Sequence, residues 1–509
     1  MKKLVSVLLT MVMVFAMTAT VFAEENIYSI TINNSAEGHT YEAYQIFTGD
    51  LSGTTLSNIV WGSGVSTKGQ TALQNTYDNA ETKSAAGVAA ALNENNAKQF
   101  AKDAAGDLTE TKFVSTYSEA NKNYTISGLA AGYYLVKDQD GSLTGDNDSY
   151  TEYIVKVVSN TTATPKSDKP TVEKKVKDIN NSTETEMSSW QDSADHDIGD
   201  SVPFQLKATL ANNVSSYTTY KVVFHDTQSK GLTYNNDAVV KIGDKDVTES
   251  FTIETTTNDD GTTTLTVSCD DVKALGAGNS SVITVEYTAK LNKDAVLGSA
   301  GNPNEVYLEY SNNPNKSEEG NSETGNTPED VVIVFTYKTI INKVTKNPDY
   351  NPGVEGSKEY IPLTGAEFTL EKYNKETNEW KAITAVKNDE GTTFTFTGLD
   401  DGNYRLTETK TPAGYNTIDP IEFTVTADHE VLSDNPALKS LSGNVETGAL
   451  TFTSNTTDGS LSADVVNQAG NTLPETGGMG TTIFYVLGSI LVLGAAVLLI
   501  TRKRMGAQR

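Results

Sequence analysis

The chain has 509 residues, in which 66 Asp and Glu outnumber 39 Lys and Arg and give a formal net charge of −27 at pH 7. This acidity argues against nucleic acid or an anionic membrane surface as a partner, because both would repel the chain. The length corresponds to roughly three domains of ordinary size.

Residues 1–23 predict a secretory signal peptide. Lys2 and Lys3 provide a basic start, an apolar stretch follows, and a small-residue cleavage site ends at Ala23. A first transmembrane helix is the weaker interpretation, since polar residues without stop-transfer charges come next. We therefore expect an exported chain.

The exported chain is predicted to be mostly β-structure. Residues 84–105, rich in Ala, predict one or two helices. Elsewhere Thr and Val alternate with polar residues, a pattern typical of half-buried antiparallel strands. The clearest runs are 251–257, 262–268, 282–291, 330–337, 392–399 and 421–427. Several such runs in one segment favour β-sandwiches over parallel sheets.

Two polar segments, 160–176 and 313–330, are broken by Pro, Gly or Asn and indicate boundaries within the chain. Together with the signal peptide and the tail they predict this division: 1–23, 24–165, 166–337, 338–470 and 471–509. The first and third large blocks share short similar segments, 30–35 with 339–344 and 128–138 with 398–410. We therefore expect one fold in both of these blocks and a different one in the middle.

Cys269 is the single cysteine, so no disulfide can form within the chain and another stabilising element is expected. Residues 138–148 contain the acids for a calcium site but not the register of an EF-hand, which leaves calcium there as a minor alternative. No histidine pair has metal-ligand spacing; the histidines are His39, His196, His225 and His429. We expect no enzyme active site, no cofactor and no resident metal.

The tail combines three signals. Residues 481–500 form an apolar run long enough to span a bilayer, and a basic segment, 502–504, follows it and is expected to stay in the cytoplasm. Just before the run stand Leu473, Pro474, Glu475, Thr476 and Gly477. This arrangement resembles the cell-wall sorting signal of Gram-positive surface proteins. The resemblance implies that a sortase cleaves between Thr476 and Gly477 and transfers the Thr476 carbonyl to an amine.

The segment 153–176 resembles the pilin-motif region of sortase-assembled backbone pilins, in which a Tyr-Pro-Lys-Asn core supplies the acceptor lysine. Here the core is Thr-Pro-Lys-Ser (164–167), which matches only Pro and Lys. The resemblance implies Lys166 as the acceptor, with Lys169 as the alternative.

Further segments resemble major pilins. Residues 38–53 and 56–65 are similar to the first domain of these proteins, while 363–373 and 404–415 resemble a Cna-B-type domain and its E-box. The resemblance implies an all-β chain of three tandem Ig-like sandwiches of Cna-A and Cna-B type, with a helical insertion in the first.

In this family, buried Lys and Asn side chains join as isopeptide bonds with the help of a nearby acid. Burial lowers the pKa of the amine and raises that of the acid, which favours a neutral nucleophile and a protonated carboxyl that polarises the amide. The resemblance implies two such sets: Lys174, Asp226 and Asn304 in the middle block, and Lys343, Glu408 and Asn467 in the third.

Some assignments stay open at this point. Lys175 and Asn312 are alternatives in the middle block, because strand alternation turns only one of two neighbouring lysines inward. In the first block, Asn34 corresponds to Lys343, and Lys137 is taken to correspond to Glu408. We therefore expect no isopeptide bond in the first block.

The resemblance implies a major pilus shaft subunit in which Thr476 of one copy is joined to Lys166 of the next. Its implied partners are a sortase, identical subunits, minor pilins, cell-wall peptidoglycan and, through adhesion, host surface ligands. A wall-anchored monomeric adhesin or a minor pilin is the alternative, and the lysine between the first two blocks favours the shaft.

Overall fold

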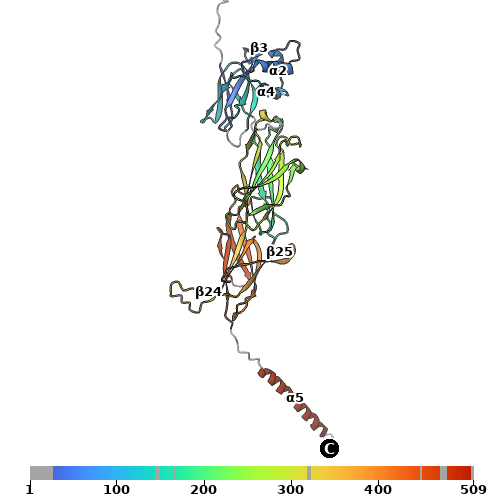
Figure 1. Cartoon of the computed structure of the whole chain (residues 1–509), viewed down its shortest axis with the longest axis vertical. Helices are drawn as coiled ribbons and strands as arrows, with labels where there is room; N and C mark the ends of the chain where they lie inside the picture. Colours follow the sequence, from blue (N-terminus) through green and yellow to red (C-terminus); the bar gives the residue numbers. More distant parts are fainter. Residues whose placement is uncertain are drawn as a thin grey trace, which may run out of the picture.

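The computed structural model describes residues 27–93, 95–143, 149–165, 168–317, 323–447, 450–470 and 479–505. Its strands form three bodies arranged in a line, with α5 (Met479–Met505) beyond the last of them (Figure 1). In each body two sheets pack face to face around an apolar core. The predicted all-β class of tandem sandwiches is confirmed. The signal peptide predicted at 1–23 lies outside the described residues.

The first sandwich carries the helices. One sheet contains, in order, β5 (Thr116–Ser118), β6 (Asn123–Leu129), β1 (Tyr28–Ile32) and β9 (Thr161–Ala163). The other contains β3 (Thr55–Trp61), β2 (Tyr41–Ser52), β7 (Gly132–Asp138) and β8 (Glu152–Val157), with β4 (Phe113–Val114) beside β2. Between β3 and β4 lie α2 (Thr67–Tyr77), α3 (Ala85–Ala91) and α4 (Ala97–Ala105). The last two match the prediction for 84–105, while α2 was not predicted.

The middle sandwich is the largest. One sheet contains, in order, β10 (Thr171–Val176), β12 (Ser201–Thr209), β19 (Val282–Leu291), β15 (Val239–Ile242) and β16 (Lys245–Asp246), with β14 (Leu232–Tyr234) beside β19. The other contains β11 (Ser193–Asp195), β22 (Asp330–Phe335), β20 (Asn302–Ser311), β13 (Val222–Gln228), β18 (Thr263–Cys269) and β17 (Thr252–Thr257), with β21 (Thr324–Asn326) beside β20. Short 3-10 turns are η1 (Val214–Ser216), η2 (Thr248–Ser250) and η3 (Pro314–Lys316).

The last sandwich has two sheets of similar size. One contains, in order, β27 (Val386–Lys387), β28 (Thr393–Leu399), β23 (Tyr337–Lys346), β33 (Ser460–Asn467) and β32 (Thr453–Asn455), with β24 (Tyr360–Pro362) beside β23. The other contains β26 (Glu379–Ile383), β25 (Glu367–Asn374), β29 (Gly402–Lys410), β30 (Ile421–His429) and β31 (Leu438–Thr447).

Alternation explains why the strands were predictable. Along β19, apolar residues at every second position are buried and the residues between them are partly or fully exposed. Each of the six predicted runs forms a strand. The run 330–337 is divided, because β22 ends at Phe335 and β23 begins at Tyr337. The domain limits predicted at 165/166 and 337/338 stay a prediction.

The first and last sandwiches share their topology. The order β6-β1-β9 in one corresponds to β28-β23-β33 in the other, and β3-β2-β7-β8 corresponds to β26-β25-β29-β30. In both, the opening strand pairs in parallel with the closing strand. The weak sequence similarity between the first and third blocks therefore reflects one fold, which in the first block contains three additional helices.

The junction between the middle and last sandwiches is tight. Only Thr336 separates β22 from β23, so the chain passes from one sandwich to the next almost without interruption. Beside it, the N–H of Ile198 donates to the carbonyl of Gly398 at 3.0 Å. A Cβ at Gly398, where φ is +75°, would lie 2.6 Å from the Ile198 side chain, so the close approach requires glycine.

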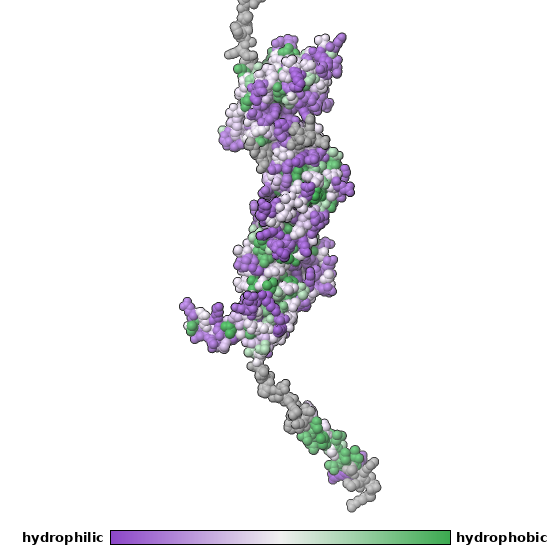
Figure 2. Space-filling view, in the orientation of Figure 1, coloured by the Kyte–Doolittle hydropathy of each residue, from purple (hydrophilic) through white to green (hydrophobic). Residues whose placement is uncertain are grey.

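Helix α5 is apolar over most of its described length, and Figure 2 shows its hydrophobic side chains set apart from the mostly hydrophilic sandwiches. Among the described residues, no helix is both long and apolar enough to cross a membrane. The span predicted at 481–500 includes side chains, 481–484, that lie outside this description.

Candidate isopeptide sites

The middle sandwich brings one predicted set of residues together. Lys174 on β10, Asp226 on β13 and Asn304 on β20 are each 0% exposed. The Lys174 ammonium forms an ion pair with Asp226 Oδ2. Because every second residue of a strand faces the core, these three inward positions meet between the two sheets.

Tyr287, on β19, links this set. Its hydroxyl accepts from Lys174 Nζ at 3.2 Å and from Asn304 Nδ2 at 2.8 Å, and it donates to Asp226 Oδ1 at 2.8 Å. Asn304 Oδ1 has no hydrogen-bond partner, which leaves the amide carbonyl available to an acid. Sequence reasoning missed Tyr287, although its inward position in the alternating run 282–291 was a usable signal.

Strand geometry separates the alternatives that the sequence leaves open. The Lys175 side chain points outward and is 28% exposed, whereas Lys174 is fully buried. Asn312 follows the end of β20, beyond the part of the strand that pairs with β13. Asn304 lies within that paired part. The geometry therefore favours Lys174 and Asn304.

The surroundings of Lys174 favour a neutral amine. Burial lowers the pKa of Lys174, and the negative charge of Asp226 opposes this shift without cancelling it. Its Nζ lies 5.5 Å from the ring centre of Phe204 and 5.6 Å from that of Tyr287, so the nearest surfaces are largely aromatic. The neutral amine carries the lone pair that a nucleophile needs.

The last sandwich brings the second set together. Lys343 on β23 lies opposite Val465 on the parallel strand β33, two residues before Asn467. Its Nζ donates to Asn467 Oδ1 and, at 3.1 Å, to the Val465 carbonyl. Glu408, on β29 of the facing sheet, lies 3.6 Å from Lys343 Nζ and accepts from Asn467 Nδ2 at 2.9 and 3.1 Å. Lys343 and Asn467 are 0% exposed and Glu408 is 5% exposed.

Burial lowers the pKa of Lys343 to about 8, against the opposing charge of Glu408. Near pH 8 about half of this amine would then be neutral. The aromatic neighbour is Phe368, whose ring centre lies 5.7 Å from Nζ. The set therefore holds a nucleophile, an amide and a carboxyl in direct contact.

The first sandwich differs at the same positions. Leu129 pairs with Tyr28 as Leu399 pairs with Tyr337, and this register assigns Asp138, not Lys137, to the position of Glu408. The prediction for Lys137 was wrong by one residue, since the similar segments 128–138 and 398–410 themselves match Asp138 to Glu408.

Asp138 is buried, and none of the lysines that the structure describes forms an ion pair with it. Its carboxylate contacts His39 Nδ1 at 2.7 Å and accepts from the backbone and hydroxyl of Thr151. Asn34 occupies the position of Lys343 and donates to the Tyr41 hydroxyl at 2.8 Å. The first sandwich therefore has an acid at this place but no amine.

Several predicted residues cannot be located. Lys166 lies outside the described residues, as do the five residues 473–477 of the sorting motif. The acidic segment 138–148 is described only in part. Lys169 is half-buried in the segment that leads into β10.

Three family models match parts of the chain. Residues 198–314 match the Cna-B-like domain of Gram-positive pilin backbone subunit 2, residues 355–436 match a prealbumin-like fold domain, and residues 465–505 match the LPXTG cell wall anchor motif. The last match includes the predicted sorting signal.

Known proteins of similar sequence or structure include pilins. The trypsin-resistant surface T6 protein of Streptococcus pyogenes is 25% identical over 454 residues, which cover 75% of this chain and 76% of that protein. The solved T6 backbone pilin of S. pyogenes gives a TM-score of 0.54 at 19% identity and covers 88% of this chain and 100% of that one. The major pilin SpaD of Corynebacterium diphtheriae gives 0.47 at 18% identity, with 88% and 98% covered.

These matches agree with the arrangement of the sheets. The T6 pilin structure, which is described as modular with three domains, shares the fold of this chain over nearly its whole length. The middle and last sandwiches each contain a match to a domain model, and the anchor motif follows them. The chain is therefore a cell-wall-anchored surface protein that combines domains of the Gram-positive pilins with an LPXTG motif.

Proposed function

We propose that the chain is the major shaft subunit of a covalent pilus. The observation that carries this proposal is the line of three sandwiches (Figure 1). In the sequence, the anchor motif follows the last of them, and the lysine-bearing segment 164–170 lies between β9 of the first and β10 of the middle one. A bond from the tail of one copy to that segment of the next would extend this line from copy to copy. The role is structural rather than enzymatic, in keeping with the backbone pilins that the chain resembles.

Assembly would proceed by acyl transfer. The sortase thiolate attacks the Thr476 carbonyl, the bond to Gly477 breaks, and the released amine leaves with α5. The neutral Nζ of Lys166 on the next copy then attacks the thioester, forms an amide and returns the thiol. Helix α5 would thus hold the precursor in place until a covalent bond replaces it.

We infer that both buried sets form isopeptide bonds. In the last sandwich, Lys343 Nζ would attack the side-chain carbonyl carbon of Asn467 while Glu408 carries protons between the two nitrogens. One C–N bond forms, one breaks, and ammonia leaves. In the middle sandwich Lys174, Asn304 and Asp226 would take the same roles, with the Tyr287 hydroxyl holding the acid and the amide.

A blot of boiled, detergent-treated cell-wall extract tests the polymer. Cells that contain the sortase should give a ladder of high-mass species with the wild-type chain and monomer only with Lys166→Ala. Lys169→Ala is the control variant and should keep the ladder.

A ladder that survives Lys166→Ala but not Lys169→Ala would move the acceptor to Lys169. A wild-type chain that remains monomeric beside an active sortase would contradict the shaft and support a wall-anchored adhesin.

A further inference from the structure

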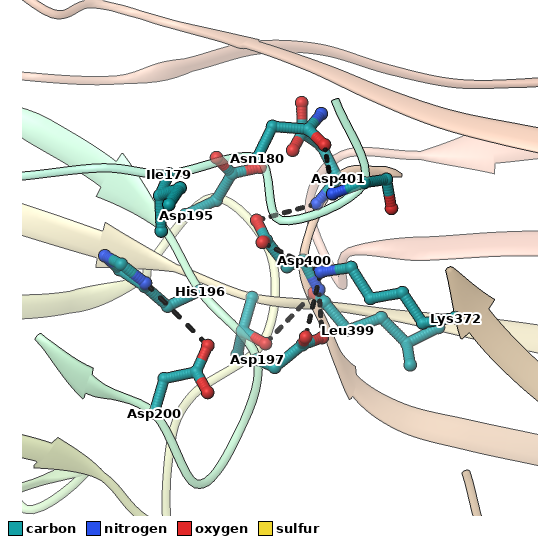
Figure 3. Close-up of polar contacts among 12 residues, drawn as sticks. Ile179, Asn180, Asp195, His196, Asp197, Asp200, Lys372, Leu399, Asp400 and Asp401 are labelled. Carbon is teal, nitrogen blue, oxygen red and sulfur yellow. Dashed lines mark hydrogen bonds and ion pairs between the residues drawn. The ribbon is translucent and has the colours of Figure 1, made fainter. Parts of the chain in front are cut away.

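Outside the isopeptide sets, buried charge concentrates where the middle and last sandwiches meet (Figure 3). Asp195 ends β11 of the middle sandwich, and Asp197 and Asp200 follow it. Asp400 and Asp401 form the turn between β28 and β29 of the last sandwich. The N–H of Asp400 donates to Asp197 Oδ1 at 2.9 Å, so the two groups are in contact.

Three carboxylates converge within this cluster. Oxygens of Asp195, Asp400 and Asp401 all lie within 4.8 Å of one another. Asp195 is 3% exposed and Asp400 is 0% exposed. The convergence combines side chains from both sandwiches, so any ligand held there would contact both.

One oxygen in the cluster lacks a partner. Asp195 Oδ2 is buried and makes no hydrogen bond of normal geometry to any described residue. The neighbouring Tyr337 hydroxyl, which interacts with Asp195, also lacks a hydrogen bond of normal geometry. Because a buried carboxylate oxygen without a partner costs free energy, this atom indicates a place for a cationic ligand.

The cations of the cluster are already engaged. Lys372 Nζ lies 2.8 Å from Asp197 Oδ2 and 2.9 Å from Asp400 Oδ2. His429 Nε2 lies on the other side of Asp195, 3.4 Å from its Oδ1. Burial lowers the pKa of His196, so this ring is neutral near pH 7.

The charges in the cluster therefore do not balance. Lys372 and His429 face six carboxylates, which are Asp178, Asp195, Asp197, Asp200, Asp400 and Asp401. Buried carboxylates can be compensated by protons or by a metal ion. An open oxygen on a carboxylate that converges with two others favours the ion.

We propose that Asp195, Asp400 and Asp401 bind one divalent cation, best matched by Ca²⁺, which ties the middle sandwich to the last. Ca²⁺ takes oxygen ligands at about 2.4 Å in a flexible geometry, so small rotations of these three side chains would bring one oxygen of each to a single ion. Carboxylate oxygens are the donors that Ca²⁺ prefers. The proposal does not depend on sortase assembly.

Calcium binding to the full chain tests the site. After EDTA treatment and exchange into neutral buffer, equilibrium dialysis against Ca²⁺ should show one equivalent more for wild type than for Asp195→Asn or Asp401→Asn. Asp389→Asn, in an exposed turn of the last sandwich, is the control and should bind as wild type does. Ca²⁺ should raise the unfolding temperature of wild type and the control but not of the other two variants.

The outcomes divide clearly. Wild type that binds no Ca²⁺ would contradict the proposal and leave protons as the compensating charge. Binding that persists in both variants would assign the ion elsewhere, with the acidic segment 138–148 as the first alternative. If Asp195→Asn does not fold, the more peripheral Asp401→Asn decides, with a far-ultraviolet spectrum to verify its fold.

Discussion

At the residue scale, a covalent bond would remove the free-energy cost of burying the amines of Lys174 and Lys343. An ammonium enclosed by aromatic rings and strands loses its hydration, and the acid beside it restores only part of that loss. A bond to asparagine turns amine and amide into one neutral amide. The proposed reaction therefore removes a buried titratable amine as well as closing the sandwich.

Glu408→Ala should prevent the bond in the last sandwich, because no other group would move protons between Lys343 and Asn467. Mass spectrometry of the intact chain should find the variant heavier than wild type by the mass of one ammonia, once the mass change of the substitution itself is subtracted. A cross-link between positions 124 apart should contribute on the order of 5 kcal/mol, by the chain-entropy estimate for a loop of this length. Glu371→Ala, on the outer face of the same sheet, should keep the bond; bond loss in that control would contradict a specific role for Glu408.

A chain that cannot form the bond should become more stable as pH rises from about 8. In Asn467→Ala, the folded pKa of Lys343 is expected to stay near 8, below the unfolded value of about 10.4, so the unfolded state binds more protons between these values. The free energy of unfolding should rise by up to about 3 kcal/mol across this window and lose that gain as pH falls through 8. Urea titrations at several pH values measure it.

Adding Lys343→Met to Asn467→Ala should abolish the rise, because no amine is left to titrate. A rise of the same size in this double variant would assign the pH dependence to other groups.

At the element scale, the first and last sandwiches form a natural comparison. Both place the closing strand parallel to the opening one, but only β23 and β33 carry the amine and the amide. In the first sandwich β1 and β9 pair over three positions without a candidate bond. The same architecture therefore exists with and without the residues for this cross-link in one chain.

Hydrogen exchange should reveal that difference. Amides of β1 and β9 should exchange at least tenfold faster than those of β23 and β33, because opening the last sandwich would first have to separate bonded strands. Mass spectrometry of peptides from the exchanged chain measures this. Equal protection of the two strand pairs would mean that the contacts of His39, Asp138 and Tyr41 stabilise the first sandwich as well as a bond does.

The sequence predicted strands better than contacts. Alternation identified β17, β18 and β19, because side chains on one face follow from the chain itself. Helix α2 was missed, since only Gly69 and Leu73 of its residues are buried and its pattern is mostly polar. Lys137 was assigned in place of Asp138, one residue away, although the similar segments 128–138 and 398–410 already match Asp138 to Glu408.

The candidate sites were predictable in part. Lys343, Glu408 and Asn467 came from family resemblance, and the structure brings them into contact. Tyr287 and the cluster around Asp195 were not predicted. The inward position of Tyr287 could be inferred from its alternating run. The residues that it meets, like the members of the cluster around Asp195, depend on which distant strands become neighbours, and no local pattern carries that information.

At the scale of the whole molecule, the three sandwiches lie along one axis and the tail extends beyond the last (Figure 1). The linkers between neighbouring sandwiches are short, and only Thr336 stands between β22 and β23. The calcium site that we propose lies beside this connection. The axis is thus defined by a nearly continuous strand together with the charged cluster next to it.

Tension along such a polymer would follow a short route. A pull at Thr476 would reach Asn467, cross to Lys343, run back through Thr336 and β22 to Asn304, and cross to Lys174. It would leave the subunit at Lys166. Residues 175–303 and 344–466 would bear none of this force, and neither would the first sandwich, which lies before Lys166. The sandwich without a candidate bond would thus be the one that carries no load in the proposed pilus.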